Sequence, residues 1–243
     1  MLYSRYSLFL IQFTDMKIHR FYTKEPLSGD IFTSVDKETI HQIRTVFRMK
    51  NGSHIIVFNG TGTDYEIEIT DITTKSISGT IVKKIPTQAP SHKRALALAV
   101  LKKDNFELVC QKATELGITD IYPIITDRTI KQQLNADRLQ KIIIEAVEQS
   151  GRGDIPTLHS TQTLVEIYQH TKDSYTSYVA DIGAPLPLRS HHEDTLVYIG
   201  PEGGWSDEEK LFFKEKDIVA ISLGQFVLRG ETAAIATATL LGQ

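Results

Sequence analysis

From Arg94 to the C-terminus, short apolar runs alternate with segments whose apolar residues recur at helical spacing. Residues 94–101, 118–124, 177–181, 195–199 and 218–223 read as strands, and the helical segments are 105–116, 136–149, 163–170, 207–216 and a last one from Glu231. Strands that alternate with helices pair in parallel, because each helix returns the chain across the sheet. This part of the chain is therefore predicted to be an α/β domain with a mainly parallel sheet.

In the part of the chain before residue 87, the apolar residues are spaced differently. Its β-branched or aromatic runs are short and separated by glycine turns, and they cover 19–22, 53–58, 65–70 and 76–84. One helix is predicted over 36–48, with Ile40, Ile43 and Phe47 on its apolar side. Several short strands around a small core indicate a small β-barrel.

The change from short strands to alternating strands and helices predicts how the chain is divided into domains. We expect an N-terminal appendage at 1–15, a barrel domain at 16–86, a linker at 87–93 and the α/β domain at 94–243. The apolar run in the appendage is too short to cross a bilayer, and no small-residue cleavage site follows it. We therefore expect no membrane association.

Charge is unevenly distributed between the two parts. Residues 16–94 carry twelve Lys and Arg against eight Asp and Glu, a net charge of +4, whereas residues 95–243 carry fourteen against twenty-one, a net charge of −7. A polyanion would accordingly be held mainly by the first part, although an imbalance this small can also be a surface feature without function.

A single cysteine, Cys110, excludes an internal disulfide framework and is typical of a protein of the reducing cytoplasm. It shares a helical stripe with Phe106 and Val109, which indicates a core thiol rather than a nucleophile. No group of residues has metal-ligand spacing, so no metal site is expected.

The segment Ile199-Gly200-Pro201-Glu202-Gly203-Gly204-Trp205-Ser206 joins a predicted strand to a helix start. Ser206 and Glu209 have the spacing of a capping box, and adjacent glycines let a ligand approach the backbone closely. Open parallel sheets bind ligands beyond the carboxyl ends of their strands, where the loops 181–183 and 223–230 are also expected. An ordinary strand-to-helix turn is the alternative. The GxGxxG and GxxxxGK[ST] motifs are absent, so a dinucleotide or nucleoside triphosphate site has no direct support.

Five segments together have the order and spacing found in the ribosomal RNA small subunit methyltransferase E family. They are Phe106-Glu107, residues 111–117, Glu145 with residues 148–152, residues 199–204 and residues 228–233. Over 16–243 the chain therefore resembles this family of the SPOUT class, whose members use S-adenosylmethionine to methylate N3 of one uridine in 16S ribosomal RNA.

The resemblance implies a fold and a set of partners. The fold would be a C-terminal SPOUT α/β domain with a deep trefoil knot, preceded by a PUA-like β-barrel that binds RNA. The partners would be 16S ribosomal RNA in the 30S subunit and a second copy of the chain, bound through the C-terminal domain.

The resemblance also implies roles for individual residues. The S-adenosylmethionine site would consist of Gly200, Glu202, Gly203, Gly204, Leu223, Gly224, Leu228, Thr232 and Ala233. For catalysis we expect Arg229 to stabilise negative charge on the uracil oxygens and Glu231 to accept the N3 proton. Expected RNA contacts are Arg20, His41, Arg44, Arg48, Gln149 and Arg152.

Two other functions remain open from the sequence. A SPOUT methyltransferase that acts on another ribosomal or transfer RNA site would have the same cofactor residues. A ribosome-binding protein without catalysis would have lost its pocket, and the intact Gly203-Gly204 and Arg229 weigh against it.

Overall fold

The computed structural model describes residues 18–88, 90–129, 133–187 and 193–242, which belong to two compact units. One unit contains the residues up to Val57 together with Tyr65–Lys84, and the other contains Phe58–Asp64 and the chain from Ile85 onward. The expected appendage at 1–15 lies outside the described residues.

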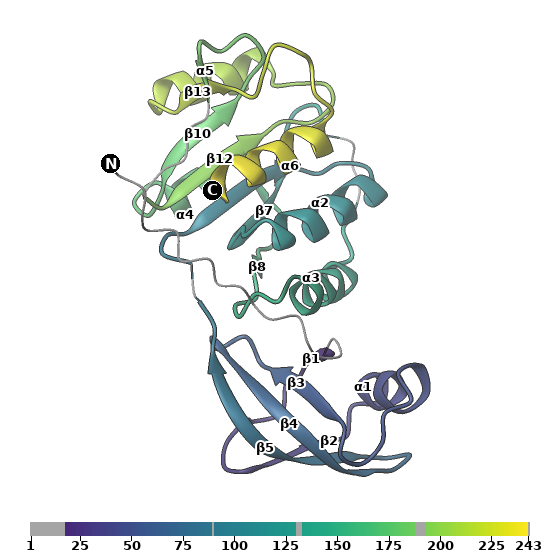
Figure 1. The fold of residues 1–243 in the computed structure, drawn as a ribbon. Coiled ribbons are helices and arrows are strands. Elements are labelled where there is room, and N and C mark those ends of the chain that lie inside the picture. Colours follow the sequence, from purple (N-terminus) through teal and green to yellow (C-terminus); the bar gives the residue numbers. More distant parts are fainter. Residues whose placement is uncertain (1–17, 89, 130–132, 188–192, 243) are drawn as a thin grey trace, which may run out of the picture. The chain divides into compact units, whose positions relative to one another are not determined.

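The first unit is built on a five-stranded sheet with the strand order β1-β3-β4-β5-β2. The strands are β1 Arg20–Tyr22, β2 Ile31–Ser34, β3 His54–Phe58, β4 Thr63–Ile72 and β5 Ile77–Pro86. The sheet curls into a half-barrel (Figure 1) around buried Phe32, Ile55 and Ile67. The predicted small barrel is confirmed in this open form, and β2 is an additional strand that the sequence pattern did not indicate.

The helix predicted over 36–48 consists of two different kinds of helix. α1 spans Lys37–His41, and a π-helix, η1, continues it over Gln42–Val46. α1 begins one residue after the predicted start. Asp36 is its N-cap, and the Asp36 carboxylate accepts a 2.7 Å hydrogen bond from the Thr39 N–H in the first turn.

The π-helix changes which side chains face the core. The Phe47 N–H donates a 2.8 Å hydrogen bond to the carbonyl oxygen of Gln42, five residues earlier, so this turn holds one residue more than an α-turn. Ile40 and Ile43 are buried as predicted, but Phe47 is 39% exposed. The prediction that Phe47 lies on the apolar side was therefore wrong in its degree of burial, because α-helical spacing does not hold across η1.

The second unit contains a parallel sheet with the order β11-β13-β10-β12-β6-β7-β8, and β9 also pairs with β7. All pairings given for its described strands are parallel, which confirms the predicted α/β class. The strands are β6 Arg94–Ala99, β7 Asp120–Ile125, β8 Thr157–Leu158, β9 Gln162–Thr163, β10 Thr176–Ala180, β11 Leu186–Pro187, β12 Thr195–Ile199 and β13 Val219–Ser222.

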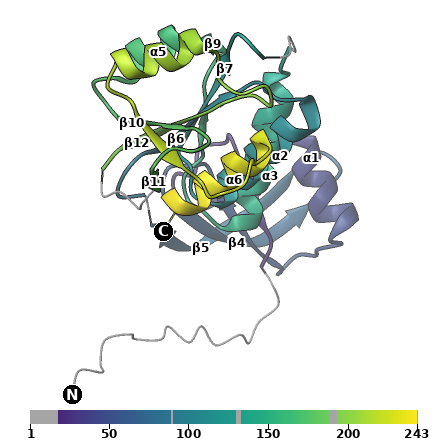
Figure 2. The same cartoon turned by 90° about the horizontal axis from the view of Figure 1, so that it is seen from above.

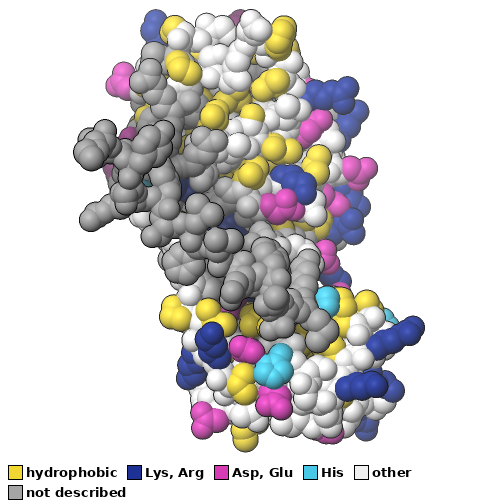
Figure 3. Space-filling model, viewed as in Figure 1, with side chains coloured by type: hydrophobic (Ala, Val, Ile, Leu, Met, Phe, Trp, Pro, Cys, Tyr) yellow, Lys and Arg dark blue, Asp and Glu magenta, His cyan; other side chains and the backbone are white. Residues whose placement is uncertain are grey.

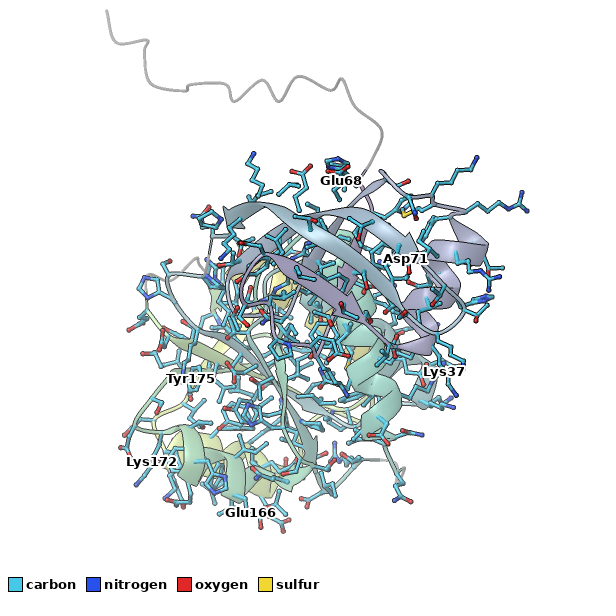
Figure 4. All side chains as sticks on the ribbon, turned by 90° about the horizontal axis from the view of Figure 1, so that it is seen from below. Lys37, Glu68, Asp71, Glu166, Lys172 and Tyr175 are labelled. Carbon is cyan, nitrogen blue, oxygen red and sulfur yellow. The ribbon has the colours of Figure 1, made fainter. Side chains whose placement is uncertain are left out.

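In the described part of this unit, five helices accompany the sheet: α2 Lys103–Glu115, α3 Ala136–Ser150, α4 Leu164–Thr171, α5 Asp207–Glu215 and α6 Gly230–Leu241. Figure 2 shows α5 on one side of the sheet and α2, α3 and α6 on the other. Leu164 and Ile167 of α4 pack in the same apolar cluster as Phe213 of α5. The solvent side of α4 carries Glu166, and Lys172 follows its end (Figure 4). None of the helices in the described ranges is long and apolar enough to cross a bilayer.

The sheet is buried on both faces, as expected for parallel strands between helices. Ala95, Ala97 and Ala99 of β6 belong to the cluster with α4 and α5, and the alternate residues Leu96 and Leu98 are fully buried as well.

Cys110 of α2 is also fully buried, and burial raises the pKa of its thiol to about 12. It is a core residue, as predicted.

Three neighbouring strands end at the same edge of this sheet. β10 lies between β12 and β13 and is parallel to both. The chain therefore leaves Ala180, Ile199 and Ser222 on one side, and the three loops that follow are brought together there.

Candidate functional site

A cavity lies beyond these strand ends and holds about 610 Å³ of empty volume, its open mouth included. The three loops and the start of α6 supply the lining residues Ala180, Asp181, Ile182, Ile199, Gly200, Pro201, Gly204, Trp205, Leu223, Gly224, Phe226, Leu228, Gly230 and Ala233.

The turn after β12 needs glycine at two of the lining positions. Gly204 has φ +69°, and its N–H donates a 2.8 Å hydrogen bond to the carbonyl oxygen of Pro201. A Cβ on Gly200 would lie 3.0 Å from Cε2 of Trp205, so a side chain there would displace the indole. Gly200 and Gly204 thus leave the backbone of the turn open to the cavity because neither residue has a side chain.

The helix that follows the turn begins with the predicted capping box. The Ser206 Oγ accepts from the Glu209 N–H at 3.2 Å, and the Glu209 Oε2 accepts from the Ser206 N–H at 2.8 Å. Since both N–H groups are bonded within the box, fewer donors remain there for an anionic ligand.

The lining is mostly apolar side chains and glycine backbone, with one ionisable side chain, Asp181, among the described lining residues. Its Oδ1 accepts a 2.9 Å hydrogen bond from the N–H of Ile182. The described lining contains no lysine, arginine or histidine that would pair with a phosphate inside the cavity. An acidic group in an apolar pocket instead favours a ligand that carries positive charge or hydroxyl groups.

Six of the nine residues implied for the cofactor lie in the cavity lining: Gly200, Gly204, Leu223, Gly224, Leu228 and Ala233. Glu202, Gly203 and Thr232 are exposed and are not among the lining residues. The carbonyl oxygen of Gly203 accepts a 2.8 Å hydrogen bond from Arg128 Nη1, and a Cβ on Gly203 would lie 3.2 Å from Cβ of Arg128. Gly203 therefore faces Arg128.

Arg229 and Glu231 are the sequence neighbours of Gly230, which lines the cavity. Arg229 is the exposed N-cap residue of α6, and Glu231 is in the first turn of that helix. The Glu231 Oε2 is buried and has no hydrogen-bond partner among the residues that the structure describes. Burying a carboxylate oxygen without a partner is costly, which makes Glu231 a candidate for contact with a bound molecule.

The resemblance assigned no cofactor role to the other eight lining residues, although the sequence placed most of them in segments at the ligand-binding edge: Ala180, Asp181, Ile182, Ile199, Pro201, Trp205, Phe226 and Gly230. Two signals could have found some of them. Asp181 is the last residue of a predicted strand, at the edge where ligands bind, and Trp205, the single tryptophan of the chain, adjoins the glycine pair.

Three of the expected RNA contacts lie close together in the chain of the first unit. His41 ends α1, Arg44 lies in η1, and Arg48 follows with φ +52°; all three are exposed. Arg20 lies on β1 and is half-buried.

The two remaining expected RNA contacts lie at the end of α3 and differ in exposure. Gln149 is exposed, whereas the Arg152 side chain is only 11% exposed. Arg152 Nη1 donates to the carbonyl oxygens of Thr114 at 2.7 Å and Ile118 at 2.9 Å, and its Nε and Nη2 donate to the Asp154 carboxylate. Most of the guanidinium is thereby used to join α3 to the end of α2.

No group of three or more His, Cys, Asp or Glu within the described ranges is arranged to hold a metal ion.

Comparison with known proteins identifies the same two regions. Residues 87–242 match the model of an RNA methyltransferase domain, and residues 35–82 match that of an RNA methyltransferase PUA domain. The chain is 31% identical to the ribosomal RNA small subunit methyltransferase E of Rickettsia conorii, over 90% of this chain and 93% of the relative. It is 28% identical to the protein of that name from Bacillus subtilis, over 88% and 90%.

The fold also matches a solved structure. The crystal structure of a ribosomal RNA small subunit methyltransferase E from Neisseria gonorrhoeae, bound to S-adenosyl methionine, has a TM-score of 0.83 at 28% identity. The match covers 91% of this chain and 95% of that chain.

Proposed function

The chain belongs to the ribosomal RNA small subunit methyltransferase E family, and from this membership we propose that it uses S-adenosylmethionine to methylate N3 of one uridine in 16S ribosomal RNA. The observation that carries the proposal is the cavity at the ends of β10, β12 and β13, with Arg229 and Glu231 on either side of its lining residue Gly230.

The cavity fits the chemistry of this cofactor. Its glycine backbone can bond an adenine edge, its apolar side chains can cover the adenosine and the methionine chain, and Asp181 can offset the positive charge. The scarcity of free N–H donors at the start of α5 agrees with a ligand that carries no phosphate. When bound, S-adenosylmethionine supplies a methyl group on a positively charged sulfur.

We propose complementary roles for Arg229 and Glu231. The uracil N3–H is a weak acid, and its deprotonated form is the nucleophile. The Glu231 carboxylate, with its unpartnered Oε2, would accept the N3 proton. The negative charge that develops on O2 and O4 would be stabilised by Arg229, which is always charged and only donates hydrogen bonds. The reaction leaves one proton on Glu231 for release to solvent.

RNA would be held by both parts of the chain. His41, Arg44 and Arg48 would contact phosphates on the first unit, and such contacts position the RNA without reading its sequence. Gln149 could contact the target nucleotide directly, whereas Arg152 would act mainly by supporting the end of α3. We propose the assembled 30S subunit, in the cytoplasm, as the substrate.

We further propose a homodimer formed through the C-terminal domain, which would contain the trefoil knot that the resemblance implies. Ile182, Phe226 and Val227, beside or within the cavity lining, are 68%, 73% and 76% exposed. Burying these apolar side chains against a second copy would stabilise the dimer.

A SPOUT methyltransferase for another RNA site is the second candidate, because nothing in the cavity lining identifies the target base. The experiment combines calorimetry with label transfer. S-adenosylmethionine should bind the purified protein, and its labelled methyl group should enter 16S ribosomal RNA of unmodified 30S subunits. Label only in transfer RNA would favour the second candidate. Absence of both binding and transfer would favour a non-catalytic ribosome-binding protein.

A further inference from the structure

An exposed apolar pair follows the π-helix of the first unit. Val46 is 58% exposed and Phe47 is 39% exposed, although both belong to the segment that supplies the buried Ile40 and Ile43. Figure 3 shows Lys and Arg side chains gathered over the α1 region of this unit, with apolar side chains beside them. We call the exposed surface of residues 41–50 the η1 face.

The η1 face is strongly basic. His41, Arg44, Arg48 and Lys50 are all exposed, and Glu38 is the single acidic residue in the sequence from 37 to 50. Among the described residues, no acidic side chain forms an ion pair with Arg44 or Arg48. Cations that are not neutralised by neighbouring carboxylates attract a polyanion.

The backbone holds these side chains in an unusual arrangement. The π-helix turns Phe47 out of the core, and Arg48 adopts φ +52°, a left-handed conformation that is rare for a residue other than glycine. π-helical turns and such conformations are found frequently at functional sites. Here they place an aromatic ring between two exposed arginines in the sequence.

The ring of Phe47 is held by neighbouring rings. Its centroid lies 3.7 Å from that of His19, with an interplanar angle of 35°, and 5.9 Å from that of Phe21 in an edge-to-face contact. Phe21 is 3% exposed and belongs to the core. An exposed ring that is anchored to the core loses little conformational entropy when a flat ligand stacks on it.

We propose that the η1 face binds single-stranded RNA, with one unpaired base stacked on Phe47 and the flanking phosphates paired with Arg44 and Arg48. Unpaired bases are recognised by stacking on aromatic side chains next to cations, which is the combination present here. The inference deepens the proposed function and rests on it, because the proposed function identifies the ligand as RNA. It adds a contact with a base to the phosphate contacts proposed for the first unit.

The test measures binding of the full-length protein to a fluorescent single-stranded RNA of about 12 nucleotides and to an abasic RNA of the same length. Phe47→Leu keeps an apolar side chain but removes the ring. It should weaken binding of the base-containing RNA about 5- to 100-fold and leave the abasic RNA unchanged. Phe47→Trp should restore affinity, and a 2-aminopurine in the RNA should be quenched by wild type and Phe47→Trp but not by Phe47→Leu.

Two control variants separate stacking from charge and from general apolar contact. Arg44→Ala should weaken both RNAs alike, because it removes a phosphate contact. Ile31→Ala removes an apolar side chain of β2 that is 71% exposed and should change neither affinity. Circular dichroism of Phe47→Trp checks that the unit remains folded.

The inference is overturned if Phe47→Leu binds both RNAs like wild type, or weakens both equally. It is also overturned if the variant loses 30S binding while its RNA affinity is unchanged, since the face would then contact a ribosomal protein. Failure of the proposed function is a separate result, because the protein would then transfer no methyl group even though the RNA-binding measurements still report on Phe47.

Discussion

The indole Nε1 of Trp205 donates a 3.0 Å hydrogen bond to the carbonyl oxygen of Ala180. This bond joins the glycine turn after β12 to the end of β10. It therefore fixes the positions of two of the three loops around the cavity relative to each other. Trp205 is 4% exposed, lines the cavity and is the single tryptophan of the chain. Its fluorescence therefore reports on this site.

The first prediction uses this reporter together with Gly200→Val. Addition of S-adenosylmethionine should change the tryptophan emission of wild type, because the ligand would contact the indole. The valine should weaken binding at least about tenfold, since its Cβ would lie 3.0 Å from the indole Cε2 and its methyl groups would add to the clash. Lys210→Ala, on the exposed side of α5, is the control and should bind normally. Wild-type affinity in Gly200→Val would remove the turn from the site.

The second prediction concerns Asp181. Asp181→Asn should lower the affinity for S-adenosylmethionine more than the affinity for S-adenosylhomocysteine. The two losses should differ by about 3- to 10-fold, because the product lacks the positive charge on sulfur. Calorimetry with adenosine is the control, since adenosine carries no such charge and should bind the variant as it binds wild type. An equal loss for all three ligands would instead indicate that Asp181 bonds the ribose.

The third prediction concerns Arg229. Arg229→Ala should lower the rate of methyl transfer about 100- to 1,000-fold, the usual cost of losing a group that stabilises developing negative charge. The affinity for S-adenosylmethionine should stay within about twofold, because Arg229 is exposed and is not among the lining residues. Single-turnover kinetics with saturating RNA measure this step. Unchanged kinetics would refute the assigned role.

The fourth prediction concerns Arg152. Arg152→Ala should destabilise the protein by about 2–4 kcal/mol, because the carbonyl oxygens of Thr114 and Ile118 and the Asp154 carboxylate lose a charged donor. Urea denaturation measures the loss, with Gln149→Ala as a neighbouring exposed control. If stability is unchanged while the KM for RNA rises, Arg152 contacts RNA instead.

Local patterns in the sequence were sufficient to predict much of the fold. The strand 195–199 was predicted with the bounds of β12, and the Ser206–Glu209 box was recognised because its hydrogen bonds join residues three apart. The alternation of strands and helices predicted the parallel sheet, since short connections leave few other topologies.

Other features were not predictable from these local patterns. The π-helix places one extra residue in a turn, and the spacing of apolar residues in 36–48 does not indicate this extra residue. Arg152 bonds residues more than 30 positions away, so its partners could not be inferred from the motif in which it occurs. Asp181 and Trp205 meet in one lining because β10 and β12 pair; the sequence placed both loops at the ligand-binding edge of the sheet but did not give this strand order.

Identification of the methylated nucleoside tests the central claim most directly. Unmodified 30S subunits are incubated with the protein and labelled S-adenosylmethionine, and the 16S ribosomal RNA is digested and analysed by liquid chromatography and mass spectrometry. We predict that the label is recovered as 3-methyluridine from a single position. Label in a ribose 2′-O-methyl group, in another base or only in added transfer RNA would contradict the account.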